Sequence, residues 1–330
     1  MNSYARELKG TLIGLTAILM WSTLATLTSY CKEVPPFQLI AMAFTIATGL
    51  GLVWMRCQGY SISNLVRLPL NAWLLGVSGL FGFHFFYFMA LKYAPIVHAS
   101  LISYLWPLLI VLMSALLPGE RLRWYNLVGA LAGLFGASLI VTGGSTFSLG
   151  SGSSLGYGFA LLSAVLWAGY SVLSRLFRAI PSYSISGFCA VTALLAFICH
   201  FLFETTVVPS GLSWLAILGL GLGPVGGAFF TWDVGVKTGN IKVLGALSYA
   251  APLLSTFLLL AMGMANPSWA LGLACLLIVG GSLLASGDML SGHYGKRNTD
   301  TIKYLLINSK LFKKRTIVSH LRIIIADNDN

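Results

Sequence analysis

The sequence predicts an all-α integral membrane protein whose ten transmembrane helices form two inverted five-helix repeats. Of its 330 residues, 57% are hydrophobic and only 9% are charged, whereas soluble domains carry about 25% charged residues. The apolar runs are long and do not alternate with period two, which indicates helices and excludes an outer-membrane barrel. The segment SYLWPLL at 103–109 returns 145 residues later as SYAAPLL at 248–254, which indicates an internal repeat.

Ten apolar runs are each about as long as a helix must be to cross a bilayer. They cover residues 10–30, 37–55, 70–91, 97–117, 125–143, 155–174, 184–203, 212–233, 243–263 and 268–287. Short connections force neighbouring spans to run antiparallel. The first run is not followed by a small-residue cleavage site, so we expect a membrane span and not a cleavable signal.

The repeat divides the chain into two halves, residues 1–146 and 147–290, followed by a basic tail, residues 291–330. The same offset aligns Gly82 with Gly227 without a gap. Because five spans separate the copies, the second copy must lie upside down in the membrane relative to the first. Inverted repeats of this kind are typical of secondary transporters, whose central site opens to either side.

Lys and Arg predict the orientation in the membrane. With a cytoplasmic N-terminus and before the tail is counted, the inner loops hold ten of them, namely Arg6, Lys9, Arg56, Arg67, Arg121, Arg123, Arg175, Arg178, Lys237 and Lys242. The outer loops hold only Lys32 and Lys92. The positive-inside rule places both termini in the cytoplasm. It also explains the net charge of +11 without a nucleic-acid partner. The tail is expected to lie near anionic lipid, or to bind a regulatory partner.

The features of an enzyme or an ATP-driven pump are missing from the sequence. The five cysteines have neither pairing nor metal-ligand spacing, so we expect no disulfide and no metal. No span has an acidic residue at its centre, and neither a Ser-His-Asp arrangement nor a phosphate-binding glycine loop is recognisable. The chain is therefore predicted to be no enzyme and to need no cofactor.

Matched prolines near the middle of the fourth and ninth spans predict a kink in each half. A proline inside a helix lacks an N–H group and frees the carbonyl group four residues earlier. Pro107 would free the carbonyl of Ser103, and Pro252 that of Ser248. We interpret both prolines as hinge residues; the alternative is that they only bend their helices.

Polar side chains near these kinks are candidates for a substrate site. Tyr104 and Tyr249 lie beside the two prolines, and their hydroxyl groups would be costly if they faced lipid. His84 and Tyr87 share one face of the third span. An ionisable residue inside a membrane points to function by default; a hydrogen-bonded histidine packed in the core is the alternative.

Four tryptophans inside the spans are expected to line the same site. Trp21 and Trp167 are repeat partners, Trp106 lies at mid-depth, and Trp232 aligns with Tyr87. Interior aromatic rings with polar tips suit flat apolar solutes. Ordinary core packing is the alternative interpretation.

Charged residues near the span ends are candidates for a gate. Asp233, Lys237 and Lys242 cluster at the inner end of the eighth and ninth spans, and Lys92 is the outer repeat partner of Lys237. The functional interpretation is a latch at each face. The alternative is that these lysines extend to the membrane surface and close nothing.

The PGER segment at 118–121, which leads into the Gly-rich span GALAGLFG at 129–136, resembles the drug/metabolite transporter superfamily and its EamA repeat. The second half departs from the pattern, because MANP at 264–267 lacks the Glu of that loop. The resemblance covers residues 8–288. It implies ten spans around a central cavity between the halves.

Three further segments are similar to the aromatic amino acid exporters of that superfamily. They cover residues 11–23, 103–107 and 232–249. This resemblance implies export of aromatic or other neutral amino acids. It assigns substrate contact to the matched positions Trp21, Tyr104, Trp106, Trp232 and Tyr249.

We therefore expect a secondary transporter that exports aromatic or neutral amino acids across a bacterial inner membrane. The halves would rock around a midplane aromatic cavity, and the chain would act as a monomer in contact with lipid. Export of lipophilic cations or drugs, held by cation–π attraction, or of another small metabolite, is the alternative. A pore or a sensor is the alternative outside the transporters, and counterflow would separate a carrier from a channel.

Overall fold

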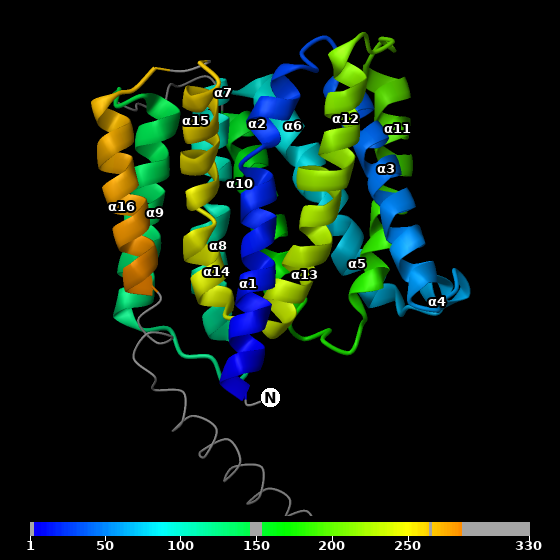
Figure 1. The fold of residues 1–330 in the computed structure, drawn as a ribbon, viewed down its shortest axis with the longest axis horizontal. Coiled ribbons are helices and arrows are strands. Elements are labelled where there is room, and N and C mark those ends of the chain that lie inside the picture. The colour runs from blue at the N-terminus through cyan, green and yellow to red at the C-terminus, as the bar shows by residue number, and fades with distance from the viewer. Residues whose placement is uncertain (1–2, 146–153, 264–265, 286–330) are drawn as a thin grey trace, which may run out of the picture. The chain divides into compact units, whose positions relative to one another are not determined.

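Helices account for all regular structure in the described residues, 3–145, 154–263 and 266–285, of the computed structural model (Figure 1). Nine helical segments in this part are long and apolar enough to cross a membrane, and the helix Trp269–Ala285 is apolar but shorter. The predicted fold class is confirmed: the protein is an all-α membrane protein.

Successive membrane spans alternate in direction along the chain, and several spans are built from two consecutive helices. In the first half they are α1 (Ser3–Trp21), α2 (Leu24–Ser29), α3 (Pro36–Cys57), α4 (Ser63–Val66), α5 (Leu70–Val77), α6 (Phe83–Tyr93), α7 (Ile96–Ser103), α8 (Trp106–Met113) and α9 (Trp124–Thr142). In the second half they are α10 (Ser154–Leu173), α11 (Ile185–Phe203), α12 (Leu212–Leu222), α13 (Ala228–Thr238), α14 (Ile241–Leu247), α15 (Ala250–Ala261) and α16 (Trp269–Ala285). Short 3₁₀ turns cover Ser114–Leu116 and Ser182–Ser184. We call the end of the bundle at which α1 begins the N-terminal face.

The fourth and ninth spans break where the prolines predict a kink. The fourth divides into α7 and α8, with Pro107 as the second residue of α8, and the ninth divides into α14 and α15, with Pro252 as the third residue of α15. The expectation of a free carbonyl is wrong for Ser248. The helix restarts with a tighter turn, in which the Ala251 N–H donates to the Ser248 oxygen at 3.1 Å.

The third and eighth spans each contain one π-helical turn, and the two turns are repeat-related. They cover Ser78–Gly82 between α5 and α6, and Gly223–Gly227 between α12 and α13. A π turn holds one more residue than an α turn and is frequent at functional sites. Because of the extra residue, the helix that follows the π turn presents a different face to its neighbours. In both halves that next helix carries predicted site residues, His84 and Tyr87 on α6 and Trp232 on α13.

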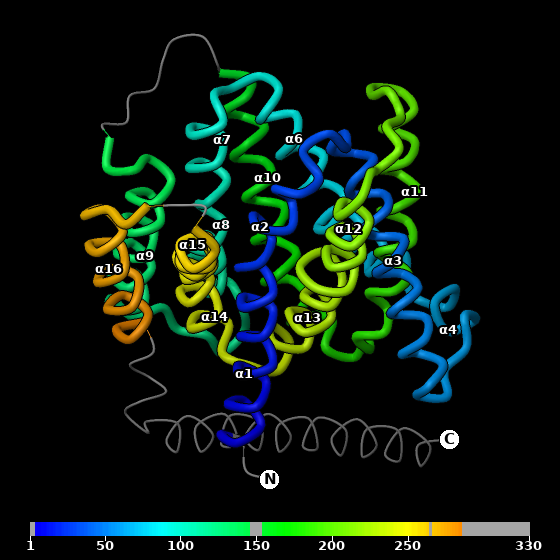
Figure 2. The backbone as a smooth tube through the Cα atoms, turned by 45° about the horizontal axis from the view of Figure 1, so that its top comes forward, coloured from blue at the N-terminus to red at the C-terminus, as the bar shows by residue number. Residues whose placement is uncertain are grey.

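The helix pairs between the halves are reciprocal (Figure 2). Helix α1 packs along α13, and its repeat counterpart α10 packs along α6. Helices α3 and α11 pair with each other, as do α9 and α16, the last helices of the two halves. A pseudo-two-fold relation between the halves requires these pairings. Glycines permit the closest approaches, since a methyl group on Gly235 would overlap Gly14 and one on Gly129 would overlap Gly281.

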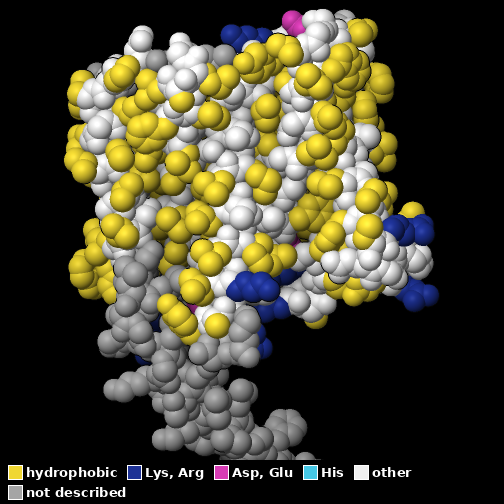
Figure 3. All heavy atoms as spheres, viewed as in Figure 1, with side chains coloured by type: hydrophobic (Ala, Val, Ile, Leu, Met, Phe, Trp, Pro, Cys, Tyr) yellow, Lys and Arg dark blue, Asp and Glu magenta, His cyan; other side chains and the backbone are white. Residues whose placement is uncertain are grey.

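The surface of the bundle reflects the membrane environment. Apolar side chains cover the viewed face, and Lys and Arg gather mainly toward the N-terminal face (Figure 3).

Helix α13 continues five residues beyond the predicted end of its span at Asp233, to Thr238. The helix can continue because Lys237 lies one turn from Asp233 and pairs with it inside the protein, so neither charge has to reach water.

Candidate functional site

Four tryptophans from four different spans meet near the middle of the bundle. The ring centroid of Trp21 lies 5.9 Å from Trp106, 5.8 Å from Trp167 and 5.0 Å from Trp232. Trp106 lies 6.0 Å from Trp232, and Trp167 stacks on Trp232 at 6.2 Å. Aromatic pairs in this range contribute about 0.5–1.5 kcal/mol each beyond the area they bury. The structure thus brings together all four tryptophans singled out in the sequence.

Two of the four indole groups are tied to the scaffold, and two are not. Trp21 donates to the carbonyl of Pro224 in the π turn of the eighth span at 3.1 Å, and Trp232 donates to the Ser171 hydroxyl at 3.0 Å. Within the described residues, the N–H groups of Trp106 and Trp167 have no acceptor. These two donors remain available to a bound molecule.

His84 lies next to the tryptophan cluster in a ring of phenylalanines. Its ring contacts Phe44, Phe83, Phe88 and Phe229 at centroid distances of 5.1–6.4 Å. Phe83 and Phe229 in turn contact Trp167, at 5.7 and 5.5 Å. His84 is therefore joined to the cluster through shared aromatic neighbours.

The hydrogen bond of His84 fixes its tautomer. Nδ1 lies 2.7 Å from the carbonyl oxygen of Leu80. Because a carbonyl oxygen only accepts, Nδ1 must carry a proton, and in the neutral ring Nε2 is then an acceptor. Among the described residues, Nε2 has no donor. A partly exposed imidazole thus offers a free lone pair beside the aromatic cluster.

Two further polar residues singled out in the sequence, Tyr87 and Tyr104, also belong to the first half. Tyr87 stacks on Phe83, and its hydroxyl lies 3.3 Å from that of Ser100. Tyr104 lies at the break between α7 and α8, is partly exposed, and its hydroxyl has no partner among the described residues. Helix α6 thus carries His84 and Tyr87, whereas the repeat-related positions on α13 hold Phe229 and Trp232.

Tyr249 is not part of this cluster, although it is the repeat partner of Tyr104. Its side chain is fully buried and packs with Leu253 and Ile278, and its ring lies directly against Gly133. The hydroxyl accepts a hydrogen bond of 3.1 Å from the Leu108 N–H. Tyr249 thus supports the broken fourth span from the opposite half.

The predicted gate residues have unequal surroundings. Lys237 Nζ lies 2.7 Å from Asp233 Oδ2 and donates to the carbonyl of Ile180 at 2.9 Å. Asp233 also accepts from the Ser182 hydroxyl at 2.6 Å. All these partners belong to the second half. A small cavity beside the pair lies between α5 of the first half and α10, α11 and α13 of the second.

Lys92 has no comparable pair. Its ammonium lies 5.8 Å from the ring centroid of Tyr93, its neighbour in sequence, and it makes no ion pair with any described residue. The two repeat-related lysines therefore differ in structure. A latch at each face stays a prediction.

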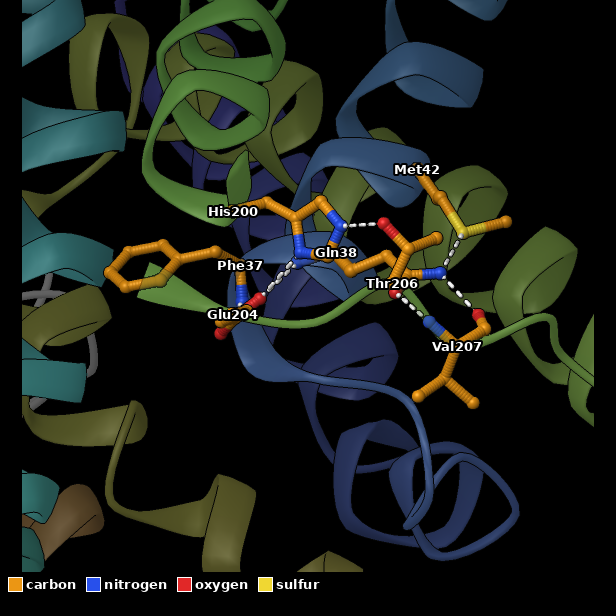
Figure 4. Close-up of polar contacts among 7 residues, drawn as sticks. All are labelled: Phe37, Gln38, Met42, His200, Glu204, Thr206 and Val207. Atoms are coloured by element: carbon orange, nitrogen blue, oxygen red, sulfur yellow. Dashed lines mark hydrogen bonds and ion pairs between the residues drawn. The ribbon is translucent and has the colours of Figure 1, made fainter. Parts of the chain in front are cut away.

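One polar network, centred on Glu204 just after α11, was missed by sequence reasoning. The Glu204 carboxylate accepts from the N–H groups of Phe37 and Gln38 at 2.9 and 3.0 Å, and His200 Nδ1 lies 2.9 Å from it (Figure 4). Gln38 also exchanges two hydrogen bonds with the backbone of Val207. The network joins the first turn of α3 to the end of α11. The available signal was the proline pair at the start of α3, because the first N–H groups of a helix need acceptors.

No described His, Cys, Asp or Glu side chains form a group of three that could hold a metal ion. Broken helices beside an aromatic cluster inside a membrane-crossing bundle are typical of secondary transporters. The profile of the EamA-like transporter family matches residues 8–142 and 154–287. The chain belongs to this family, which confirms the resemblance seen in the sequence.

Two proteins of similar sequence are named as exporters, and a solved structure has a similar fold. The "Aromatic amino acid exporter YddG" of Ancylobacter novellus is 52% identical over 278 residues, which are 84% of this chain and 96% of that protein. The protein of the same name from Escherichia coli K12 is 27% identical over 304 residues, with the same coverage of 84% and 96%. A solved crystal structure that is 51% identical matches the fold with a TM-score of 0.80, over 84% of this chain and 97% of that one.

Proposed function

We propose that this protein exports aromatic and other neutral amino acids across a bacterial inner membrane by alternating access. The observation that carries the proposal is the meeting of four tryptophans, to which the His84 imidazole is joined through Phe83, with Tyr104 at the break in the fourth span two residues before Trp106. The exporters named among its relatives support the substrate class. The reciprocal helix pairs support two halves that move as units, and no second copy of the chain is needed.

The site has the polarity that an amino acid requires. The Nε2 lone pair of His84 would accept a hydrogen bond from the substrate ammonium group. The hydroxyl of Tyr104 and the indole N–H groups of Trp106 and Trp167 would donate to its carboxylate. The tryptophan faces would hold an aromatic side chain. A free acid in the site would favour a lipophilic cation instead, and Asp233 is already paired with Lys237.

Flux of radiolabelled phenylalanine in proteoliposomes tests the proposal. A carrier should give saturable uptake that speeds up when unlabelled phenylalanine is present on the opposite side, and the same vesicles with and without a pH gradient will show whether protons drive it. Empty vesicles and a radiolabelled quaternary ammonium ion serve as controls. Uptake of the cation without uptake of phenylalanine would favour the drug-exporter alternative, and non-saturable flux without counterflow would favour a pore.

A further inference from the structure

A buried ion-pair network lies on the N-terminal face, in the connection between the fourth and fifth spans. Gly119 adopts a positive φ of 78°, which permits the tight turn that presents Glu120. The Glu120 carboxylate lies 3.4 Å from Lys242 Nζ and 3.8 Å from Arg175 Nη1. Lys242 also donates to the carbonyl of Arg121 at 3.1 Å. The side chain of Lys242 is 2% exposed, so this charge is held inside the protein.

The network connects the two halves. Glu120 belongs to the first half, whereas Arg175 follows α10 and Lys242 lies in the first turn of α14, both in the second half. In contrast, the polar partners of Asp233 and Lys237 all come from the second half. Glu120 therefore meets the geometric requirement for a latch between the halves, which the Asp233–Lys237 pair alone does not.

The repeat gives this network no charged counterpart on the opposite face. The residue that aligns with Glu120 is Ala265, and the one that aligns with Lys242 is Val97. Arg175 aligns with Ser29 at the offset that relates Trp21 to Trp167. The charges are therefore present at only one of two positions that an inverted repeat makes equivalent.

We propose that Glu120, Lys242 and Arg175 form a one-sided latch that holds the halves together at the N-terminal face. The proposal rests on alternating access. Opening that face must separate the ion pairs, which leaves the buried Lys242 charge without its carboxylate. The repeat-equivalent positions on the other face hold no such ion pair, and there the halves are joined by the hydrogen bonds from the Phe37 and Gln38 N–H groups to Glu204. The latch therefore favours the state closed at the N-terminal face, and loading of substrate from that face is the step that must break it.

Labelling of a mid-span cysteine tests the latch. Ser103→Cys is placed in a variant whose native cysteines are replaced, and a membrane-impermeant maleimide is added to one side of oriented vesicles without substrate. Glu120→Gln should raise labelling from the N-terminal face about tenfold, a shift of about 1.4 kcal/mol in the conformational equilibrium. Lys242→Met should have the same effect. Arg121→Gln is the matched control, because it removes an exposed charge from the same turn and should leave labelling unchanged.

The double variant separates a latch from general destabilisation. If the two residues act through their ion pair, Glu120→Gln combined with Lys242→Met should label no faster than either single variant. Size-exclusion chromatography and Tm show whether each variant stays folded. Wild-type labelling in both single variants, or multiplied effects in the double variant, would overturn the latch. Phenylalanine flux is measured separately, so a failure of the proposed substrate leaves the labelling result valid.

Discussion

Tyr104 and Tyr249 occupy equivalent positions in the two halves, and their surroundings separate their roles. The Tyr249 hydroxyl accepts from the Leu108 N–H, which lies just after the break in the fourth span. The Tyr104 hydroxyl has no partner among the described residues. One tyrosine therefore stabilises the fold, while the other is available to a substrate.

This difference predicts opposite phenotypes for one chemical change. Tyr249→Phe should lower stability by about 1 kcal/mol or more, because it leaves a backbone donor without an acceptor. It should leave KM for phenylalanine almost unchanged. Tyr104→Phe should raise KM several-fold with little change in Tm. Thermal unfolding in detergent and flux in proteoliposomes measure the two effects, and the same response in both variants would refute the division of roles.

His84 should act on the part that all amino acid substrates share. His84→Ala removes the free Nε2 acceptor, so transport of phenylalanine and alanine should fall by a similar factor. Trp106→Ala should raise KM for phenylalanine several-fold more than for alanine, because losing one aromatic contact costs about 0.5–1.5 kcal/mol. His98→Ala is the control for His84, since His98 bonds to Tyr157 away from the tryptophans. Equal losses for both substrates in Trp106→Ala would remove the stacking claim.

At the scale of elements, the two broken spans are the sites where movement is expected. Pro107→Ala and Pro252→Ala restore a backbone donor at each break and should let the helices straighten. We expect each variant to reach the membrane in normal amounts and to transport phenylalanine at least several-fold more slowly. Membrane abundance and initial flux are compared in the same preparation. Wild-type flux in both variants would mean that the prolines only shape the helices.

The α9–α16 pair depends on the absence of side chains at its contact. A Cβ atom on Gly281 would crowd the Gly129 carbonyl oxygen, whereas Gly280, the adjacent residue, has no neighbour within 4 Å. Gly281→Val should lower stability by about 1–3 kcal/mol through overpacking, and Gly280→Val should have almost no effect. The comparison of Tm values measures packing alone, because both changes add the same side chain to one helix.

For the whole molecule, the repeat in the sequence predicts the helix order, the kinked spans and the tryptophans that converge. It could do so because membrane spans are set by length and hydropathy, and because equivalent residues of two related halves face one interior. The repeat could not show that Tyr249 is buried against Gly133 while Tyr104 is partly exposed, since such differences depend on neighbouring side chains. The contacts of Glu120 and Glu204 were also missed, because they join residues more than 50 positions apart that no motif links.

The orientation of the whole molecule is the remaining test of the charge pattern. Ten Lys and Arg residues in the inner loops, against two in the outer loops, predict that both termini are cytoplasmic. A phosphatase reporter fused after residue 290 should be inactive, and one inserted near Gly150, after five spans, should be active; both positions lie outside the described residues. Fusions of a cytoplasm-active reporter at the same positions should give the reverse pattern. If the phosphatase is active after residue 290, the orientation is inverted. The one-sided latch would then close the periplasmic face. This measurement therefore also decides from which side of the membrane the amino acid must enter to break the latch.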